Sequence, residues 1–324
     1  ASSVISLENK TSVAVDLSAV QTIQGTAAEL EAVYVLSDSG LVTGLGNETL
    51  TVNQTTTVAQ LNILNAETSG AITATVQEGD YSTLNTLEGT NNVYTITLTE
   101  SITVDQANTL AAKTTGVVTA TLSTGDMTTL AGLNETGNAY TITITDTSAT
   151  AAALTALDAK TTVAVQAGNV TSLSGTATEV IAAYAADAAT TIVLDGDEAV
   201  SVSGTVSVAD ANTISGKTSG AVTATIATGS FTALNALNET NNAFALTLNE
   251  TISVDNANTL DAKTTGVVTA TITSGNYATV NALNGTGNAY AVTVTDSITV
   301  AEADALAAKT TGVVTATLST GDMA

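Results

Sequence analysis

The chain contains no cysteine, proline, histidine or tryptophan, and its only cations are six lysines. Without cysteine there is no disulfide framework and no cysteine nucleophile, and without histidine as well there is no zinc-finger ligand set. A general base would have to be Asp, Glu or Lys. The acids recur at repeat positions rather than at one unique place, so we predict that the chain is not an enzyme.

Positive charge is scarce, because six lysines stand against 30 acidic residues and give a formal net charge of −24. Such a surface repels nucleic acid and anionic membranes, so nucleic acid is not an expected partner. Charged residues make up only 11% of the chain and hydrophobic residues 44%, which separates it from an acidic disordered tail. No apolar run approaches the roughly 18 residues of a membrane-spanning helix, so we expect no transmembrane segment.

Aromatic residues are also rare, at 3% of the chain, and the apolar residues are mainly Ala and Val. A core of such small side chains suits thin, regularly stacked layers better than one thick globule. The sequence LAAKTTGVVTATLSTGDM, which occurs at both 110–127 and 306–323, indicates how such layers could arise. Internal repetition of this kind is the sequence signature of repeat architectures.

The lysines set the phase of the repeat, because each one precedes Thr-Thr or Thr-Ser, and Glu67 fills the one equivalent position without a lysine. The spacings from Lys10 to Lys309 are 57, 46, 47, 57, 46 and 46 residues. We predict one continuous repeat array over residues 1–324. Its super-repeats are 10–159 and 160–308, and 309–324 is the start of a further unit.

Each short repeat divides into two half-repeats of about 23 residues. The first alternates apolar residues with Thr over 72–76, which predicts a half-buried strand. Tyr81, Leu84 and Leu87 then recur at spacing three, which predicts a helix of about two turns with Asp80 as its N-cap. The same cap position is occupied in the other repeats by Asp126, Ser230, Asn276 and Asp322.

The second half-repeat alternates again over 94–98 and then places Val104, Ala107 and Leu110 on one face of a second helix, with Thr103 as its cap. Equivalent strands are expected at 140–144, 244–248 and 290–294.

Lys113 falls in the last turn of this second helix, where a cation meets the negative end of the helix dipole. An alternative is that the lysines form a column that pairs with acids on adjacent layers or on another molecule. Gly116 and its equivalents then allow the chain to turn into the next strand. The long repeats follow the same plan with one enlarged half, in which 26–37 and 176–187 form longer and more apolar helices.

Strand–helix units of this length cannot bury their apolar faces alone, but stacked units can. We therefore predict an α/β solenoid of about a dozen stacked strand–short-helix coils. One parallel sheet would be covered on its inner side by helices, a plan similar to leucine-rich repeats but without their asparagine ladder. At ~4.8 Å per layer the stack would be roughly 60 Å long. The alternatives are all-β: a chain of adhesin-like sandwiches, or a parallel β-helix.

Two repeated sets of side chains could carry binding. The outer sheet face would present columns of threonine: Thr73, Thr75, Thr119, Thr121, Thr223, Thr225, Thr269, Thr271, Thr315 and Thr317. Threonine is also the ordinary choice for an exposed strand position. Acids stack in phase after the second strand, and with their neighbours they give weak calcium candidates, the alternative being a solvated acidic face: Glu100, Asp105, Asp146, Glu250, Asp255, Asp296 and Glu302. No other cofactor is expected.

The stretches TVAVQAGNVTSLSGTATEVIAAYAAD, GLGNETLTV and TTGVVTATLSTGDM resemble the repeats of very large, acidic cell-surface proteins of marine cyanobacteria, such as those of the Synechococcus swimming-motility surface layer. This resemblance implies an extracellular or cell-surface structural role in seawater and carries over no functional residues. With no distinct polar cap at either end, the sheet edges could pair with more of the same sequence.

We therefore expect a fibre, sheath or surface-layer component that associates end to end at the cell surface or in the extracellular matrix. The alternative is an adhesin or binding module that uses the threonine face.

Overall fold

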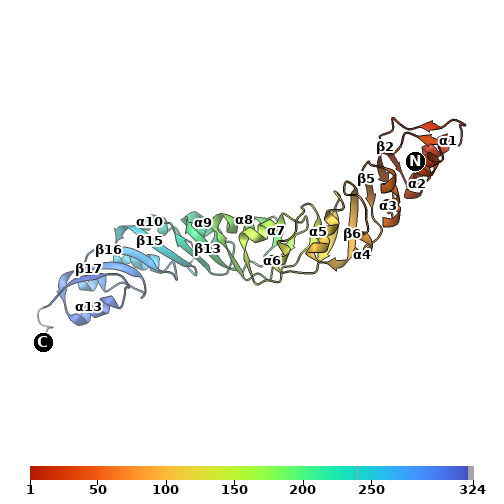
Figure 1. The fold of residues 1–324 in the computed structure, drawn as a ribbon. Coiled ribbons are helices and arrows are strands. Elements are labelled where there is room, and N and C mark those ends of the chain that lie inside the picture. Colours follow the sequence, from red (N-terminus) through yellow and green to blue (C-terminus); the bar gives the residue numbers. More distant parts are fainter. Residues whose placement is uncertain (239, 320–324) are drawn as a thin grey trace. The chain divides into compact units, whose positions relative to one another are not determined.

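The computed structural model describes residues 1–238 and 240–319. Helices and strands alternate along the chain, and the paired strands run parallel (Figure 1). The fold is therefore α/β with large parallel sheets, as the repeat predicted, and the all-β alternatives are wrong.

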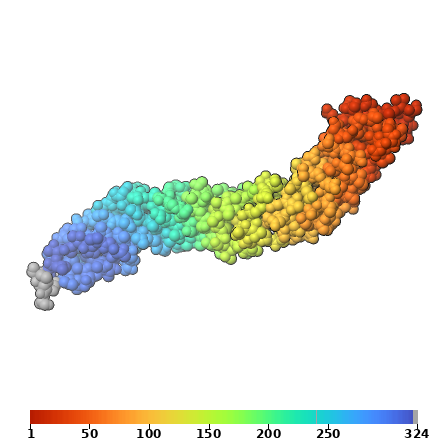
Figure 2. Space-filling model, viewed as in Figure 1, coloured from red at the N-terminus to blue at the C-terminus, as the bar shows by residue number. Residues whose placement is uncertain are grey.

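The chain forms two compact units. Unit 1 comprises Ala1–Asp146, Ala156–Ala167 and Thr190–Val193, and unit 2 comprises Thr147–Thr155, Gly168–Ala189 and Leu194–Ala324. Within each unit the colour changes steadily along the surface (Figure 2), so segments that follow one another in sequence are also neighbours in space.

The main sheet of unit 1 has six parallel strands that neighbour each other in chain order. They are β2 (Thr22–Gly25), β4 (Thr49–Val52), β5 (Ile72–Thr75), β6 (Val93–Ile102), β7 (Val118–Leu122) and β8 (Ala139–Thr141). Two small parallel sheets accompany it: β1 (Val15–Asp16) with β3 (Val42–Thr43), and β10 (Val165–Gln166) with β12 (Ile192–Val193).

The sheet of unit 2 has eight parallel strands, also neighbours in chain order. They are β9 (Ser148–Thr150), β11 (Ser172–Thr176), β13 (Ala199–Val206), β14 (Val222–Ile226), β15 (Ala243–Ile252), β16 (Val268–Ile272), β17 (Ala289–Ile298) and β18 (Val314–Leu318).

The prediction of one sheet is therefore wrong. In the enlarged half-repeat a turn separates β1 from β2, with the Val20 N–H donating to the Leu17 carbonyl at 2.8 Å, so the two strands join different ladders.

The helices lie between successive strands. They are α1 (Ser2–Glu8), α2 (Ala27–Asp38), α3 (Val58–Glu67), α4 (Tyr81–Leu84), α5 (Val104–Ala111), α6 (Met127–Leu130), α7 (Ala151–Asp158), α8 (Ala177–Ala188), α9 (Val208–Ser215), α10 (Phe231–Leu234), α11 (Val254–Asp261), α12 (Tyr277–Val280) and α13 (Val300–Ala307). The long helices α2 and α8 and the second helices of the short repeats occur where the sequence predicted them.

The first helix of each short repeat is shorter than predicted. It forms a single turn, as in α4, and Leu87 lies beyond it in the following loop, although its side chain is buried as expected. The spacing of three identified the buried residues correctly, but a turn over 85–86 ends the helix before a second turn forms.

The predicted N-caps are confirmed in the described residues. The side chains of Asp80, Asp126, Ser230 and Asn276 each accept an N–H from the first turn of their helix. Thr103 caps α5 in the same way. Asp322 lies outside the described residues.

The core follows from the alternation of the strands. In β5, Ile72 and Ala74 are buried while Thr73 and Thr75 are exposed. The helices bury their apolar stripe, which in α5 contains Val104, Ala107 and Leu110. The sheets are therefore covered by helices on one face and present the other face to solvent.

Candidate functional site

The predicted threonine face exists in both units. The ten threonines named above are exposed, except for Thr119, which is partly buried. Strand register places threonines directly beside one another on neighbouring strands, for example Thr97 beside Thr119 and Thr247 beside Thr269. In β2 and β4, the hydroxyls of Thr22 and Thr49 lie 2.8 Å apart and share a hydrogen bond. Each unit thus carries rows of hydroxyls on its open sheet face.

Four of the calcium candidates have structural partners. Each carboxylate accepts the main-chain N–H of the first residue of the short helix in the preceding half-repeat, where the positive end of the helix favours negative charge. The four bonds run from Tyr81 to Glu100 (2.7 Å), Met127 to Asp146 (2.7 Å), Phe231 to Glu250 (2.6 Å) and Tyr277 to Asp296 (2.8 Å).

The other three candidates lie in the first turns of second helices, and Glu302 accepts the Thr299 N–H at 2.8 Å in a capping box. Asp105 and Asp255 occupy the corresponding turns of α5 and α11. Within residues 1–238 and 240–319, the structure brings no three acidic side chains into a group that could hold a metal ion. The repeated spacing of these acids, which suggested calcium binding, is therefore also explained by helix capping in each repeat.

The N-cap acids of the short helices are held in their charged form. Hydrogen bonds from Ser82 and Thr83 lower the pKa of Asp80, and hydrogen bonds from Thr129 lower the pKa of Asp126. The N-terminus of each of these two helices is thus in contact with two carboxylates, its own N-cap and an acid that the next half-repeat contributes.

The lysines do not lie in the last helical turn, which corrects the prediction. Lys113 follows α5 and its C-cap, and its Nζ donates to the Leu87 carbonyl at 2.9 Å. Lys160, Lys263 and Lys309 make the equivalent bond to a carbonyl 26 residues earlier. Within each unit these lysines are therefore ordered against the preceding repeat, and their acceptors are main-chain carbonyls rather than the acids that the alternative supposed.

Strands of two kinds alternate in the short repeats. Threonine–glycine strands follow a Thr-x-Gly sequence whose threonine is buried or nearly buried; they are β5, β7, β14, β16 and β18. Asparagine–aromatic strands begin within an Asn-x-Tyr or Asn-x-Phe sequence whose asparagine is buried; they are β6, β8, β15 and β17. Thr114 shows the first kind: its hydroxyl accepts the Tyr94 N–H at 2.7 Å and donates to the Tyr94 carbonyl at 2.9 Å.

The buried asparagines form a second ladder. Their Oδ1 atoms accept the N–H of a residue in the preceding threonine–glycine strand, at 2.7–2.9 Å; the pairs are Asn92 with Ile72, Asn138 with Val118, Asn242 with Val222 and Asn288 with Val268. The expectation that no asparagine ladder exists is therefore wrong. The recurring Asn-x-aromatic pattern was visible in the sequence and was the signal that could have revealed it.

The glycines after the lysines act differently from the prediction. Gly266 has no positive φ, so it is not needed for a turn. A Cβ on it would lie 2.5 Å from the Phe244 carbonyl oxygen of the neighbouring strand. Gly116 and Gly312 face the backbone of Tyr94 and Tyr290 in the same way. These glycines allow two strands to approach closely.

The enlarged half-repeats contain a buried carboxylate that the sequence did not reveal. Glu48 occupies the strand position that Tyr94 holds in the short repeat, and the Tyr34 hydroxyl from α2 donates to it. Tyr184 and Glu198 repeat the pair at 3.0 Å in unit 2. Burial, and then the hydrogen bond to Glu48, raises the pKa of Tyr34, so this phenol stays protonated.

Two of the surface hollows are repeated features. One is lined by residues of 111–117 and 135–138, and another by the equivalent residues of 261–267 and 286–288. In the part of the chain that the structure describes, no helix has the length and apolar character that crossing a bilayer requires.

A scan against protein-family models and searches of curated proteins and of solved structures found no significant match to this chain. The resemblance to cyanobacterial surface proteins thus stays a prediction.

Proposed function

We propose that this chain is an extracellular structural protein whose strand–helix half-repeats stack as an α/β solenoid. It would form a fibre, sheath or surface layer at the cell surface by end-to-end association. The observation that carries the proposal is the repetition of one set of bonds between successive half-repeats. Lys113 and Lys263, in different units, both reach a carbonyl 26 residues back, and Thr114 and Thr264 bond the preceding strand identically. Such nearest-neighbour bonding extends without limit if further repeats are added.

The distribution of the acidic residues and the net charge also support this proposal. The acids with structural partners cap helices at every repeat instead of converging on one place, which suits a scaffold better than an enzyme. The net charge of −24 keeps such a scaffold soluble in salt, where electrostatic screening reaches only about 8 Å or less.

Electron microscopy and sedimentation of the purified protein at rising concentration, in seawater-strength salt, test the proposal. We expect filaments or sheets whose fibre diffraction shows a meridional spacing near 4.8 Å. Isolated particles at every concentration would count against self-association. Filaments that disappear only with chelator, and return with calcium, would favour the calcium alternative for the acid column.

A binding module is the second candidate, and the rows of exposed threonine hydroxyls favour it. If this face binds a polysaccharide, replacing Thr269 and Thr271 together by lysine should abolish retention on a panel of immobilised polysaccharides without changing the unfolding midpoint. Equal retention of the variant and the parent chain would reject a role for this face.

A further inference from the structure

One dipeptide distinguishes a single loop of the short repeats from its copies. The loop that follows each short helix has an acid or an amide at the same position: Glu88, Asn134, Asn238 and Asn284. Asn134 and Asn238 are each followed by glutamate, whereas Asn284 is followed by Gly285. Asn284-Gly285 is the only Asn-Gly step in the sequence, so any chemistry that needs this step occurs at one place in an otherwise repetitive chain.

An asparagine that precedes glycine can modify itself in water. The main-chain nitrogen of the glycine attacks the side-chain Cγ, so that an N–Cγ bond forms, the Cγ–Nδ2 bond breaks and ammonia leaves. The attacking nitrogen loses its proton and the departing amide nitrogen gains one. The product is a five-membered cyclic imide, and water opens it at either carbonyl to give aspartate or isoaspartate. Glycine favours the attack because it has no side chain to shield its nitrogen.

The structure leaves both reacting groups of this step available. Asn284 and Gly285 are exposed and lie outside helices and strands. The Asn284 N–H donates to Asn258 Oδ1 at 2.7 Å, so the loop is fixed through its main chain and not through the Asn284 side chain. Among residues 1–238 and 240–319, no group bonds to the Asn284 side chain or accepts the Gly285 N–H. The amide carbon and the attacking nitrogen therefore have no hydrogen bond to break before they react.

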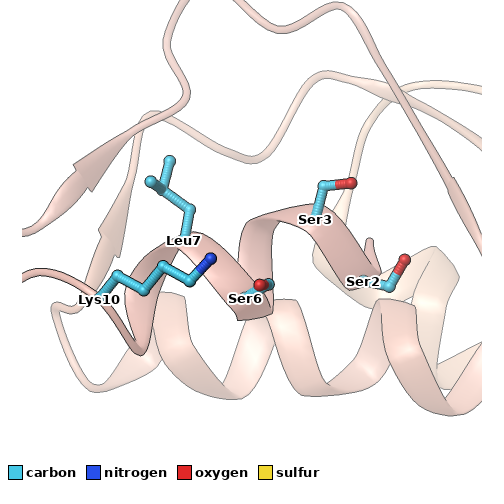
Figure 3. Close-up of a pocket in the computed structure, with 5 residues that line it drawn as sticks. All are labelled: Ser2, Ser3, Ser6, Leu7 and Lys10. Atoms are coloured by element: carbon cyan, nitrogen blue, oxygen red, sulfur yellow. The ribbon is translucent and has the colours of Figure 1, made fainter.

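Exposure alone does not make an asparagine reactive, as Asn9 at the end of α1 shows. Asn9 is also exposed, but its Nδ2 donates to the Ile5 carbonyl at 2.8 Å. The N–H of the next residue, Lys10, donates to the Leu7 carbonyl at 3.0 Å. Figure 3 shows the long Lys10 side chain lying back along α1, beside the hollow on this helix. Both reacting groups of Asn9-Lys10 are therefore engaged, which makes this step an internal control.

The copy of the loop in unit 1 shows that the fold accepts an acid at this position. The Glu88 N–H donates to an asparagine Oδ1 of the preceding helix at 3.0 Å, as the Asn284 N–H does. Gly89 has φ 78 and Gly285 has φ 70, so the two loops share their backbone conformation at this residue. An aspartate formed at position 284 should therefore fit the loop without loss of stability.

Isoaspartate should disturb the loop, because it routes the main chain through Cβ and Cγ and adds one main-chain atom. The segment 284–288 is held at both ends. At its far end Asn288 Oδ1 accepts the Val268 N–H at 2.8 Å, and Asn288 Nδ2 donates to Asp261 at 2.6 Å. The additional atom has to be accommodated between these two anchors, so the strain falls on the Asn288 bond of the asparagine ladder.

We propose that Asn284 is a site of spontaneous modification, at which the Gly285 nitrogen converts the amide to aspartate and isoaspartate, and that the isoaspartate form loosens the ladder bond between Asn288 and Val268. The reaction needs water and no enzyme. It adds one negative charge to unit 2 after the chain has folded. The inference does not depend on the proposed fibre, because it concerns one loop within a single chain.

The direct test follows the folded chain during incubation at neutral and at mildly alkaline pH. Peptide mapping by mass spectrometry measures the replacement of the amide by a carboxyl group at each asparagine. We expect Asn284 to be converted at least tenfold faster than Asn134 or Asn9 in the same molecule. The rate should rise with pH, because the attacking nitrogen must lose its proton. Equal rates at Asn284 and Asn134 would overturn the inference.

A pair of variants tests whether the glycine is the cause. Glu135→Gly creates an Asn-Gly step in the equivalent loop, and Glu135 is exposed, so the unfolding midpoint should not change. Asn134 should then be converted within about threefold of the rate at Asn284. Asn284→Gln should abolish conversion at position 284, because the longer side chain would have to form a six-membered ring. Glu135→Gly with no acceleration at Asn134 would refute the proposed reaction.

The effect on the ladder is measured on the separated products. Ion-exchange chromatography isolates the modified chains, and labelling with an isoaspartyl methyltransferase identifies the isoaspartate form. Hydrogen exchange at Val268 should be at least tenfold faster in this form than in the parent chain, and unchanged in Asn284→Asp. Equal exchange in the isoaspartate form and in Asn284→Asp would overturn the proposed loosening of the ladder.

Discussion

Replacing Gly266 by alanine should separate two strands that the structure holds in unusually close contact. A Cβ at this position would lie 2.5 Å from the carbonyl oxygen and 2.7 Å from the carbonyl carbon of Phe244, where ordinary contacts begin near 3.4 Å. The obstacle is backbone, so no side-chain rotation relieves it. The strands would have to part locally by several tenths of an ångström.

The loss in free energy of unfolding follows from the packing and the hydrogen bonds at the contact between Gly266 and Phe244. Overpacking of a well-packed site costs about 1–3 kcal/mol. The Phe244 N–H bond to Thr264 (2.8 Å) and the Thr265 N–H bond to Asn242 (2.9 Å) cross the same contact, and each is worth about 1 kcal/mol. We expect Gly266→Ala to lower the free energy of unfolding by about 3 kcal/mol or more.

Gly275 is the matched control, because it lies in the same half-repeat, has no positive φ, and a Cβ there would meet only Thr279 and Val280 side-chain atoms at 3.4 Å or beyond. Gly275→Ala should be neutral or stabilise by about 0.4–1 kcal/mol through the unfolded state. Urea unfolding followed by circular dichroism gives the free energy of unfolding of both variants. The dependence of this free energy on urea concentration is compared between them, because repeat arrays can depart from two-state behaviour. Two variants within about 0.5 kcal/mol of each other would refute the close-approach argument.

Three further substitutions test the ladders and caps. Asn288→Ala should cost about 1–3 kcal/mol in urea unfolding, because a buried N–H of the neighbouring strand loses its acceptor. Thr190→Gly should raise the thermal midpoint, with a gain of about 1 kcal/mol, because Thr190 has φ 60 where its copy Gly40 has φ 72. Asp80→Asn should keep the cap, as Asn276 does, but make stability less sensitive to acid. The lowered pKa of Asp80 stabilises the fold above the ordinary carboxyl value near 4, and this contribution is lost as pH falls through the lower folded value.

Each of these has its own control. Asn284→Ala, at an exposed position, should change stability by less than about 0.5 kcal/mol, and an equal loss at Asn288 and Asn284 would contradict the ladder. Gly40→Thr should lose about what Thr190→Gly gains. Identical pH profiles of unfolding for Asp80→Asn and the parent chain would show that this carboxylate does not contribute.

The sequence by itself determined the periodic part of this protein. Alternation of apolar residues with threonine placed the strands, a spacing of three placed the helices of the short repeats, and Asp80 and Thr103 marked where helices begin. These signals are local, since each depends on a few neighbouring residues and on whether one face of the segment can be buried. They also sufficed for the fold class, because strands that alternate with helices favour parallel pairing.

Only the tertiary structure decided what joins one half-repeat to the next. Lys113 bonds a carbonyl 26 residues away, Asn138 accepts an N–H 20 residues away, and Gly116 faces a neighbouring backbone. Read in sequence, Lys113 resembled a helix-end charge and Gly116 a turn former, because each has an ordinary local role. Their true partners lie 20–26 residues earlier in the chain, on the preceding strand or in the loop before it, and which atoms meet there depends on strand register. That register is set by the packing of whole half-repeats against one another, which no short stretch of sequence contains.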